Sequence, residues 1–416
     1  MVNFGGKKLS MNILFLTLLD FNTIYERNIY TDLLREFAKH GHNLYVISPV
    51  ERRKKQNTEL IKNDNAKILK LKIGNTQKTN IIEKGISTLS IEPQFINAIK
   101  KYFSNVKFDL VLYSTPPITF CNAVRFVKKR DGAKTYLLLK DIFPQNAVDL
   151  GMISKTGIKG LLYKYFRKKE KKLYRLSDFI GCMSQANVNY VLKHNPEVDS
   201  SKVEICPNCI DPIDMSVDYE TRVQIRKKYC IPLDKTVFVY GGNLGKPQGI
   251  DFMIKCLHTQ EQNENVFFLI VGDGTEYNKV YNYIHYCKPN NVCLMKRLPK
   301  EDYDKMVGAC DVGMIFLDHR FTIPNFPSRL LSYMQAKIPV LAVTDPNTDI
   351  GEIIVNGGFG WWCESKSIET LGKAITESLN IDTKAMGEKA FKYLDEIWNV
   401  KKQYADIAES IGWIKD

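Results

Sequence analysis

The sequence predicts an α/β protein made of two Rossmann-like, doubly wound parallel-sheet domains. Short apolar runs alternate with longer segments of helical periodicity, an order that produces βαβ units with helices on both faces of a parallel sheet. This alternation occurs in two series, separated by a segment with neither period. The 416 residues, 44% hydrophobic and 25% charged, suffice for two domains and exclude disordered and collagen-like classes.

Each expected strand is an apolar run bounded by polar or glycine-containing residues, and each expected helix has apolar residues three or four positions apart. In the first series, strands are expected at 12–18, 43–48, 67–72, 109–113, 134–139 and 178–182, and helices at 26–40, 93–104, 118–130, 159–176 and 185–194. In the second series, strands are expected at 236–240, 266–271, 292–295, 312–317 and 339–343, and helices at 250–262, 275–287, 301–309, 328–337 and 367–380.

The segment 206–218 is the expected boundary, because it contains two prolines, several aspartates and no helical period. The last segment places four apolar residues on one helical face: Val400, Tyr404, Ile407 and Ile411. The expected organisation is an N-terminal extension at 1–10, a first domain at 11–206, a linker at 207–218, a second domain at 219–390 and a C-terminal helix within 391–416.

No apolar run approaches the ~20 residues of a membrane-spanning helix. Ile13–Leu19 follows Lys7 and Lys8 as in a signal peptide, but it ends at Asp20 and has no small-residue cleavage site behind it. We interpret it as a buried first strand. An alternative is that the protein starts at Met11, with residues 1–10 a loose extension.

The ten cysteines are too sparse for a disulfide scaffold and fall mostly in apolar segments. Cys206 and Cys209 form a lone C-x-x-C without a second pair at zinc spacing. They indicate core residues in a reducing cytoplasm, with metal or redox use as the alternative. We predict no metal and no cofactor.

The formal net charge of +13 favours anionic partners, such as nucleotides, phosphorylated lipids or a membrane surface, although a solvated lysine-rich face has the same composition. The segment 159–176 holds eight Lys or Arg residues and one Glu, with its apolar residues largely on one face. Such a helix is predicted to lie on anionic lipid or approach a polyprenyl phosphate, or else to be an ordinary solvated helix. Its expected contact residues are Lys168, Lys169, Lys171 and Lys172. Nucleic-acid binding has no supporting motif.

The strongest local motif is the glycine-rich segment 241–249 (GGNLGKPQG), which lies between an expected strand and an expected helix. Glycines permit close backbone approach, and the following helix offers free N–H groups to an anion. We predict phosphate binding by Gly242, Asn243, Gly245 and Lys246, with a tight turn as the alternative. The segment has the spacing of neither a P-loop nor G-x-G-x-x-G.

Two further segments belong to the same prediction. Gly272, Asp273 and Gly274 end the next strand, where ligands of open parallel sheets bind. In the segment 325–333, Pro327 suits a helix entry, and Ser328 and Arg329 fall in or beside the first turn. A cation at a helix start is unfavourable unless an anion is shared, so Arg329 is a candidate diphosphate ligand, with a surface cation as the alternative.

In the first half, Lys140 and Asp141 follow an apolar strand and are expected in the crevice at its end. We predict a catalytic role for both. Asp141 is interpreted as a sugar-hydroxyl ligand or an acid–base group, with a helix N-cap as the alternative.

Taken together, these motifs resemble the retaining, nucleotide-sugar-dependent glycosyltransferases of family 4, which have the GT-B fold, in the branch that builds bacterial capsule and O-antigen polysaccharides. The resembling segments occur in family order from about residue 11 to 380: LLLKDIFPQNAVDLGMI, DFIGCMSQANVNYVLKH, VEICPNCID, VYGGNLGKPQGID, FFLIVGDGTE, NVCLMKRLPKEDYDKMVGACDVGMIFL and PSRLLSYMQAKIPVLAV.

The resemblance implies that the second domain holds the nucleotide-sugar donor, with UDP as the nucleotide, and the first domain a lipid-linked glycan acceptor. A cleft would separate the domains, and the final helix would return to the first. Asn243 and Gln248 occupy the positions of the family's usual Arg and Lys, which leaves Lys246 and Arg329 as replacements. Arg297 and Leu298 match the stretch lining the base, and Leu330 and Ser332 belong to the matched PSRLLSYM segment. A peripheral location at the inner face of the cytoplasmic membrane follows.

One departure concerns the two glutamates, with seven residues between them, that many members carry. The matching residues are Pro324 and Ser332, neither of which is a carboxylate, although Ser332 can still bond a ribose hydroxyl. Three hypotheses therefore stand: a hexosyltransferase-type enzyme, a GT-B epimerase of UDP-sugars, and a non-catalytic nucleotide-sugar-binding scaffold. The epimerase class usually needs histidines at its site, and none of the six lies in the glycine-rich or PSRLL segments. The scaffold predicts donor binding without turnover.

Overall fold

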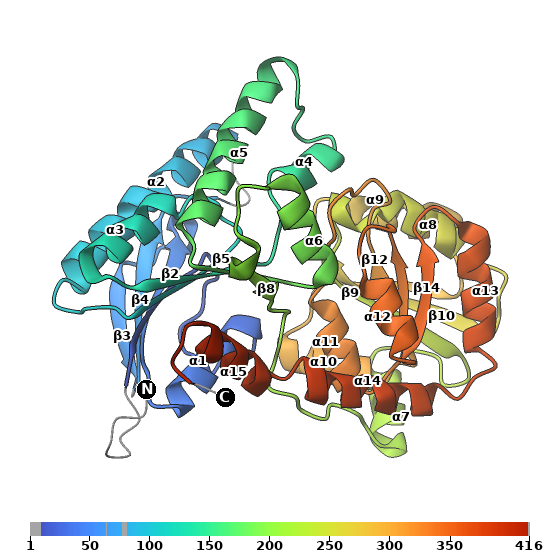
Figure 1. Ribbon diagram of the computed structural model, residues 1–416. Coiled ribbons are helices and arrows are strands. Elements are labelled where there is room, and N and C mark those ends of the chain that lie inside the picture. Colours follow the sequence, from blue (N-terminus) through green and yellow to red (C-terminus); the bar gives the residue numbers. More distant parts are fainter. Residues whose placement is uncertain (1–9, 64, 77–80, 415–416) are drawn as a thin grey trace. The chain divides into compact units, whose positions relative to one another are not determined.

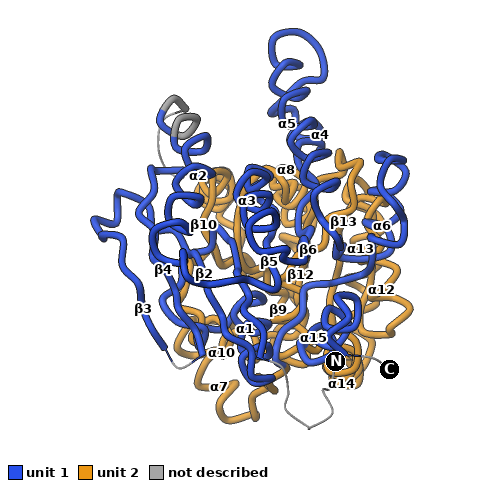
Figure 2. The backbone as a smooth tube through the Cα atoms, turned by 60° about the vertical axis from the view of Figure 1, so that its left-hand side comes forward, with its two compact units in different colours: residues 1–211, 400–416 blue, residues 212–399 orange. Residues whose placement is uncertain are grey.

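The computed structural model describes residues 10–63, 65–76 and 81–414, with the side chains of 81, 82 and 84–86 left out. Apart from Ser10, the expected N-terminal extension lies outside these residues. The chain forms two compact units: unit 1 comprises Met1–Asp211 and Val400–Asp416, and unit 2 comprises Pro212–Asn399 (Figure 2). The change of unit after Asp211 falls inside the segment expected to be a linker.

Unit 1 is built on an eight-stranded sheet with the order β3-β4-β2-β1-β5-β6-β7-β8. The strands are β1 (Asn12–Leu16), β2 (Asn43–Glu51), β3 (Glu59–Asn63), β4 (Ala66–Ile73), β5 (Leu110–Ser114), β6 (Lys134–Leu139), β7 (Phe179–Cys182) and β8 (Val203–Ile205). All neighbours are parallel except β3 and β4, which pair in antiparallel fashion with Asn63 opposite Ala66. The strand β3 was not among the expected strands, and it pairs in antiparallel fashion because so short a connection to β4 cannot make a crossover.

Helices cover both faces of this sheet. They are α1 (Ile29–Lys39), α2 (Ile81–Tyr102), α3 (Cys121–Asp131), α4 (Gln145–Asp149), α5 (Gly157–Leu176), α6 (Gln185–His194) and α15 (Val400–Ser410), with 3₁₀ turns η1 (Arg52–Lys54) and η2 (Ser200–Lys202). One face packs with α2 and α3 around a core that includes Leu14, Phe95 and Val124. On the other face, α1 contacts the sheet through Phe15 and Tyr30, whose ring centroids are 5.6 Å apart.

Helix α2 is longer than the expected 93–104, because it begins at Ile81 and continues through Pro93. Ile91, before the proline, and Phe95, after it, are both buried in the same core. A continuous apolar face on both sides of Pro93 favours one helix over the two segments that a proline usually separates.

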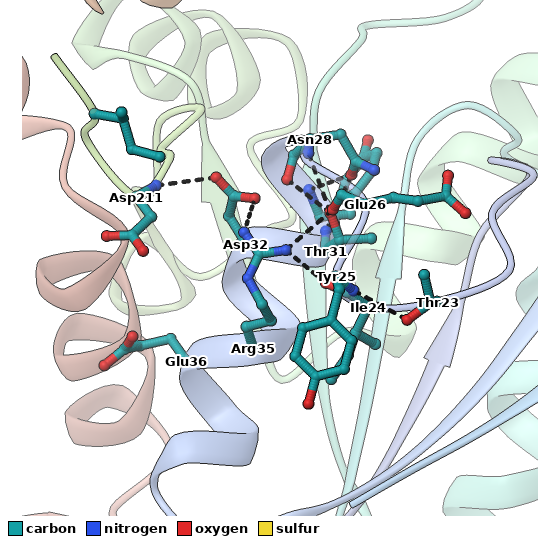
Figure 3. Close-up of polar contacts among 12 residues, drawn as sticks. Thr23, Ile24, Tyr25, Glu26, Asn28, Thr31, Asp32, Arg35, Glu36 and Asp211 are labelled. Atoms are coloured by element: carbon teal, nitrogen blue, oxygen red, sulfur yellow. Dashed lines mark hydrogen bonds and ion pairs between the residues drawn. The ribbon is translucent and has the colours of Figure 1, made fainter. Parts of the chain in front are cut away.

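The start of α1 is fixed by polar contacts at the end of the β1–α1 loop (Figure 3). Asn28 caps the helix by accepting hydrogen bonds from Tyr30 N at 2.9 Å and Thr31 N at 3.0 Å. Arg35 pairs with Asp32, and the other Asp32 oxygen accepts from Asp211 N at 3.0 Å. Asp211, at which the first chain segment of unit 1 ends, is therefore hydrogen-bonded to α1.

Unit 2 is built on a six-stranded, fully parallel sheet with the order β11-β10-β9-β12-β13-β14. The strands are β9 (Thr236–Asn243), β10 (Val266–Asp273), β11 (Val292–Met295), β12 (Val312–Phe316), β13 (Val340–Thr344) and β14 (Gly360–Glu364). The helices are α7 (Tyr219–Lys228), α8 (Ile250–Thr259), α9 (Tyr277–Cys287), α10 (Lys300–Gly308), α11 (Arg329–Gln335), α12 (Ile350–Asn356), α13 (Ile368–Ser378) and α14 (Thr383–Ile397), with the 3₁₀ turn η3 (Lys246–Gln248). One face packs with α8, α9 and α13 around residues such as Phe268, Met253 and Leu371.

The expected single helix within 391–416 is two helices in different units (Figure 1). Helix α14 ends before Trp398, whose buried ring packs 4.9 Å from that of Tyr393 in unit 2. Val400 N then donates to Ile210 O at 2.9 Å, and α15 packs against α1 in unit 1. The helix is interrupted here because Trp398 packs against rings of unit 2, whereas α15, which begins at Val400, packs against α1 in unit 1.

Among the described residues, no helix combines the length and the apolar character needed to cross a bilayer.

Candidate functional site

The glycine-rich segment lies at the carboxyl edge of the sheet of unit 2. β9 and β10 pair as far as Asn243 and Asp273, so the backbone of the loop lies directly against the 272–274 turn. A Cβ atom on Gly272 would lie 2.0 Å from Gly242 O, and Gly242 has a φ of +122°. Backbone geometry therefore requires glycine at both positions. This requirement agrees with the tight turn that was the structural alternative to phosphate binding.

Gln248 and Asn243 brace the loop from within. Gln248 Oε1 accepts from Asn243 Nδ2 at 3.1 Å and from Gly245 N at 3.1 Å. Gln248 is buried, whereas Lys246 is exposed at the start of η3. The residues standing where the family has Arg and Lys thus hold the loop, and Lys246 is the cation it presents to solvent.

Arg329 is the first residue of α11, and its guanidinium packs under the loop. Its carbon and nitrogen atoms lie 3.7–3.8 Å from where a Cβ of Gly242 would be, and its Cζ is 4.4 Å from the ring centroid of Tyr240. Nη1 is buried and has no hydrogen-bond partner, and no carboxylate among the described residues forms an ion pair with Arg329. Arg329 is partly buried, and a cation that loses hydration without gaining a counter-ion is unfavourable, so the loop is suited to bind an anion.

The other predicted donor-binding residues share this sheet edge, because they follow the carboxyl ends of parallel strands. Asp273 is exposed and accepts from Gly274 N at 2.8 Å. After β11, Arg297 is exposed and Leu298 partly buried; before and within α11, Pro327 and Ser332 are partly buried, Ser328 is exposed, and Leu330 is fully buried. The side chain of Leu330 therefore packs in the core of unit 2.

In unit 1, Lys140 follows β6 and is engaged by the chain itself. Its Nζ donates to Cys206 O at 3.0 Å and to Pro207 O at 3.1 Å. Burial lowers the pKa of its ammonium. Lys140 thus anchors the 206–207 segment, and its predicted catalytic role stays a prediction.

Asp141, the next residue, is held by neutral groups. Its two oxygens accept from Asn146 Nδ2 at 2.8 and 2.9 Å, and its backbone N–H donates to Thr115 Oγ1 at 3.2 Å. Burial raises the pKa of Asp141 to about 6, while hydrogen bonds from Asn146 and the backbone oppose the shift. The alternative of a helix N-cap does not hold, because Pro144 occupies the cap position of α4.

Tyr30 is a neighbour of Asp141 that the sequence reasoning missed. It lies at the start of α1, and burial and the charge of Asp141 raise the pKa of its hydroxyl. The topology brings the start of α1 to the ends of β5 and β6. No local signal in the sequence placed Tyr30 beside Asp141.

The four lysines predicted to contact lipid or acceptor are not equivalent. Lys169 pairs with Glu92 at 3.7 Å and Lys171 with Glu197 at 3.0 Å, while Lys172 Nζ donates to Asn122 Oδ1 at 2.9 Å. These three hold α5 to the rest of unit 1, and Lys168 is exposed.

The first half of α5 carries a different surface, which we call the apolar tip. Its members are large apolar residues exposed by 40–89%: Met152, Ile158, Leu161, Leu162 and Tyr165. Lys155, Lys159, Lys164 and Lys168 are exposed around it. Figures 1 and 2 show this end of α5 projecting beyond the sheet and helices of unit 1.

Within the described part of the chain, no group of three or more His, Cys, Asp or Glu side chains is placed to hold a metal ion. The prediction of metal-free chemistry stays a prediction.

Comparisons with known proteins agree with the two-unit architecture. Residues 28–213 match the family model Glycosyltransferase Family 4, and residues 221–393 match the model Glycosyl transferases group 1. The chain therefore contains domains of both glycosyltransferase families, and it is an enzyme of the transferase class.

Individual relatives are distant. The probable glycosyltransferase WbjE of Pseudomonas aeruginosa is 25% identical, over 76% of this chain and 77% of its own. The putative colanic acid biosynthesis glycosyl transferase WcaI of Escherichia coli is 21% identical, over 66% and 67%. The structure of HepE from Anabaena in complex with UDP-glucose superimposes with a TM-score of 0.70 at 13% identity, over 97% of this chain and all of that one. The fold is GT-B.

Proposed function

We propose that the protein is a retaining hexosyltransferase of bacterial surface polysaccharide synthesis, as in capsule or O-antigen assembly. It transfers a sugar from a nucleoside diphosphate donor, with UDP as the nucleotide, to a hydroxyl of a polyprenyl-diphosphate-linked glycan. The name of WcaI supports the pathway class, that of WbjE supports the glycosyltransferase activity, and the UDP-glucose complex of HepE supports the donor class.

The observation that carries the proposal is the Arg329 guanidinium at the glycine-rich loop. It has a buried, unpartnered Nη1 and no ion pair among the described residues. Arg329, which packs against the loop, and Lys246, which is exposed on the loop, together offer two cations to a diphosphate. Arginine suits this role because its planar donors bind phosphate oxygens in pairs.

The chemistry follows from where charge develops. Breaking the anomeric bond leaves an oxocarbenium-like sugar and a diphosphate leaving group. Arg329 and Lys246 stabilise the negative charge that grows on the diphosphate, so they lower the barrier more than they strengthen donor binding. The acceptor hydroxyl attacks from the face that the leaving group departs, which retains the configuration. The proposed reaction uses no metal or other cofactor.

On the acceptor side, Asp141 is the proposed ligand of a sugar or acceptor hydroxyl. Its carboxylate has no ion pair among the described side chains, and its pKa of about 6 keeps it mostly charged at neutral pH. In that form it accepts hydrogen bonds, and near its pKa it also accepts a proton.

We further propose that unit 1 binds the anionic inner face of the cytoplasmic membrane through the apolar tip and its ring of lysines. Exposed apolar side chains gain free energy by entering the lipid interface, and lysines around them are attracted to anionic headgroups. The tip replaces the second half of α5 as the main contact, because three lysines there already have partners in the protein.

The experiment is a thermal-shift series on the full chain with UDP, GDP, ADP and CMP, followed by their sugars, with and without EDTA. A ligand that binds only the folded protein raises the melting midpoint. We expect UDP to give the largest shift, unchanged by EDTA. A shift with none of them would overturn the donor site.

Turnover then separates the alternatives. Release of UDP that requires a lipid-linked acceptor supports the transferase. Conversion of a UDP-sugar without acceptor would identify an epimerase, and binding without either reaction would identify a scaffold.

A further inference from the structure

Arg329 is held at the glycine-rich loop by aromatic residues. Its Cζ lies 4.4 Å from the ring centroid of Tyr240, which is within the range of a cation–π contact. Tyr303 and Tyr333 are also close enough to interact with its charge. An arginine that loses part of its hydration usually pairs with a carboxylate, and no carboxylate among the described residues pairs with the partly buried Arg329.

The same tyrosines fix the backbone of the loop. Tyr333 Oη accepts from Gly241 N at 3.2 Å and donates to Met314 O at 3.0 Å. Tyr240 Oη donates to Asn243 O at 2.7 Å. The two hydroxyls therefore hold both ends of the 241–243 stretch under which Arg329 packs.

Tyr303, from α10, fills the space beside Gly241. A Cβ on Gly241 would lie 1.7 Å from Tyr303 Oη, so this position accommodates only glycine while the ring is there. The Tyr303 hydroxyl is buried without a hydrogen-bond partner. Burying a hydroxyl without a hydrogen bond costs free energy. The packing around the Tyr303 ring therefore has to offset this cost to keep the ring in place.

All three tyrosines are neutral at physiological pH. Burial raises the pKa of Tyr240, raises that of Tyr333 to about 12, and raises that of Tyr303 well above its ordinary value. Their rings attract the guanidinium without cancelling its charge, whereas a carboxylate partner would neutralise it.

We propose that Tyr240, Tyr303 and Tyr333 are positioning residues that form a neutral cradle for Arg329. The cradle holds the guanidinium at the glycine-rich loop while leaving its charge available to the diphosphate of a donor. This inference rests on the proposed function and adds the means by which the cation is kept in place.

The test is calorimetric titration of the full chain with UDP and with inorganic pyrophosphate, which probes the diphosphate site without a base. We expect Arg329→Ala to weaken both Kd values about 30-fold, as for a lost charge-assisted contact. Tyr240→Leu should weaken them about tenfold, and Tyr240→Phe only about twofold, because phenylalanine keeps the ring under the guanidinium.

The decisive variant is the double mutant Tyr240→Leu/Arg329→Ala. If Tyr240 acts through Arg329, the double mutant binds within about twofold of Arg329→Ala alone, since coupled residues are not additive. Phe238→Leu is the matched control: Phe238 is a fully buried aromatic on the same strand. It should lower the melting midpoint and leave both Kd values within about twofold.

The outcomes separate the two proposals. Additive losses in the double mutant, or equal effects of Tyr240→Leu and Phe238→Leu, would overturn the cradle while leaving the donor site in place. Absence of binding by the unmodified chain to either probe would overturn the donor site and the cradle with it. If Tyr240→Leu does not fold, Tyr240→Met, which fills more of the space, takes its place in the same cycle.

Discussion

Each unit has a charged side chain near the carboxyl edge of its sheet, and the two charges are opposite in sign. In unit 2, Arg329 lies at the carboxyl edge of the sheet against a tyrosine ring. In unit 1, Asp141 follows β6 and is bonded by the amide of Asn146. Neither has an ion pair with a described residue, so each is a charge held by neutral groups.

The two charges respond differently to burial. A carboxyl answers desolvation by binding a proton more tightly, and the pKa of Asp141 is accordingly raised to about 6. A guanidinium keeps its proton at any pH that a protein tolerates. Unit 2 therefore presents a permanent charge suited to a diphosphate, and unit 1 a charge that changes near neutrality, suited to a hydroxyl.

Arg329→Ala tests the permanent charge and should have the largest effect. We expect kcat/KM to fall about 10²–10³-fold, because a cation that stabilises a leaving group acts mainly in the transition state. Steady-state kinetics with UDP-sugar and lipid-linked acceptor measure it. Arg175→Ala, which truncates an exposed arginine of α5, is the control and should leave the rate unchanged. Equal rates for both variants would remove Arg329 from the site.

Asp141→Asn tests the titrating charge. We expect kcat to fall about 10²-fold, the scale of one acid–base or oriented polar contact. In the unmodified enzyme, activity should fall as pH drops through about 6, because the carboxyl then binds a proton. Asp149→Asn is the control, since this neighbouring carboxylate accepts from Gln145. Full activity of Asp141→Asn would restrict Asp141 to a structural role.

The two units also differ in the surface that each is proposed to use, since the apolar tip of unit 1 is proposed to bind the membrane. Ile158→Glu with Leu161→Glu should reduce partition onto vesicles containing anionic lipid by about tenfold, because it places charge in the lipid interface. UDP binding by unit 2 should not change. Leu89→Glu is the matched control, an equally apolar and 62% exposed residue of α2. Sedimentation with vesicles measures the partition, and equal loss in the control would argue against the tip.

Asn146→Ala should give the smallest effect. The Asn146 amide stabilises the charged form of Asp141, so its loss raises the carboxyl pKa further. The acid limb of the activity profile should move to higher pH by about half a unit to one unit, with little loss of rate above pH 8. If the acid limb of the activity profile does not move, the protonation of another group determines its position.

Much of the fold could be predicted from local pattern. Apolar runs such as 266–271 and helical periods such as 185–194 coincide with β10 and α6 within two residues. The antiparallel β3 was not anticipated, since three of its five residues are charged or polar and its apolar run is only two residues long. The division of the C-terminal segment into α14 and α15 depends on the packing of Trp398 in unit 2 and of α15 against α1 in unit 1, which no local sequence pattern shows.

The candidate site likewise consists of residues that the sequence predicted and residues that only the structure located. Glycine spacing and the cation near a helix start pointed to Gly242 and Arg329, and the structure places them in contact. Tyr240 and Tyr333 lay within quoted motifs without being recognised. Their roles depend on where their rings lie relative to Arg329 and Gly241, and these residues come from two separate elements, β9 and α11.

The sequence by itself determined the α/β class, the two series of βαβ units, the glycine-rich loop and the family, because periodicity, glycine spacing and motif order are properties of the chain. The tertiary structure alone decided which charges remain available. Lys169, Lys171 and Lys172 acquire partners, while Arg329 acquires only a neutral cradle. The reason is physical: the charge that a side chain offers to a ligand depends on its neighbours in space, and these come from distant parts of the chain.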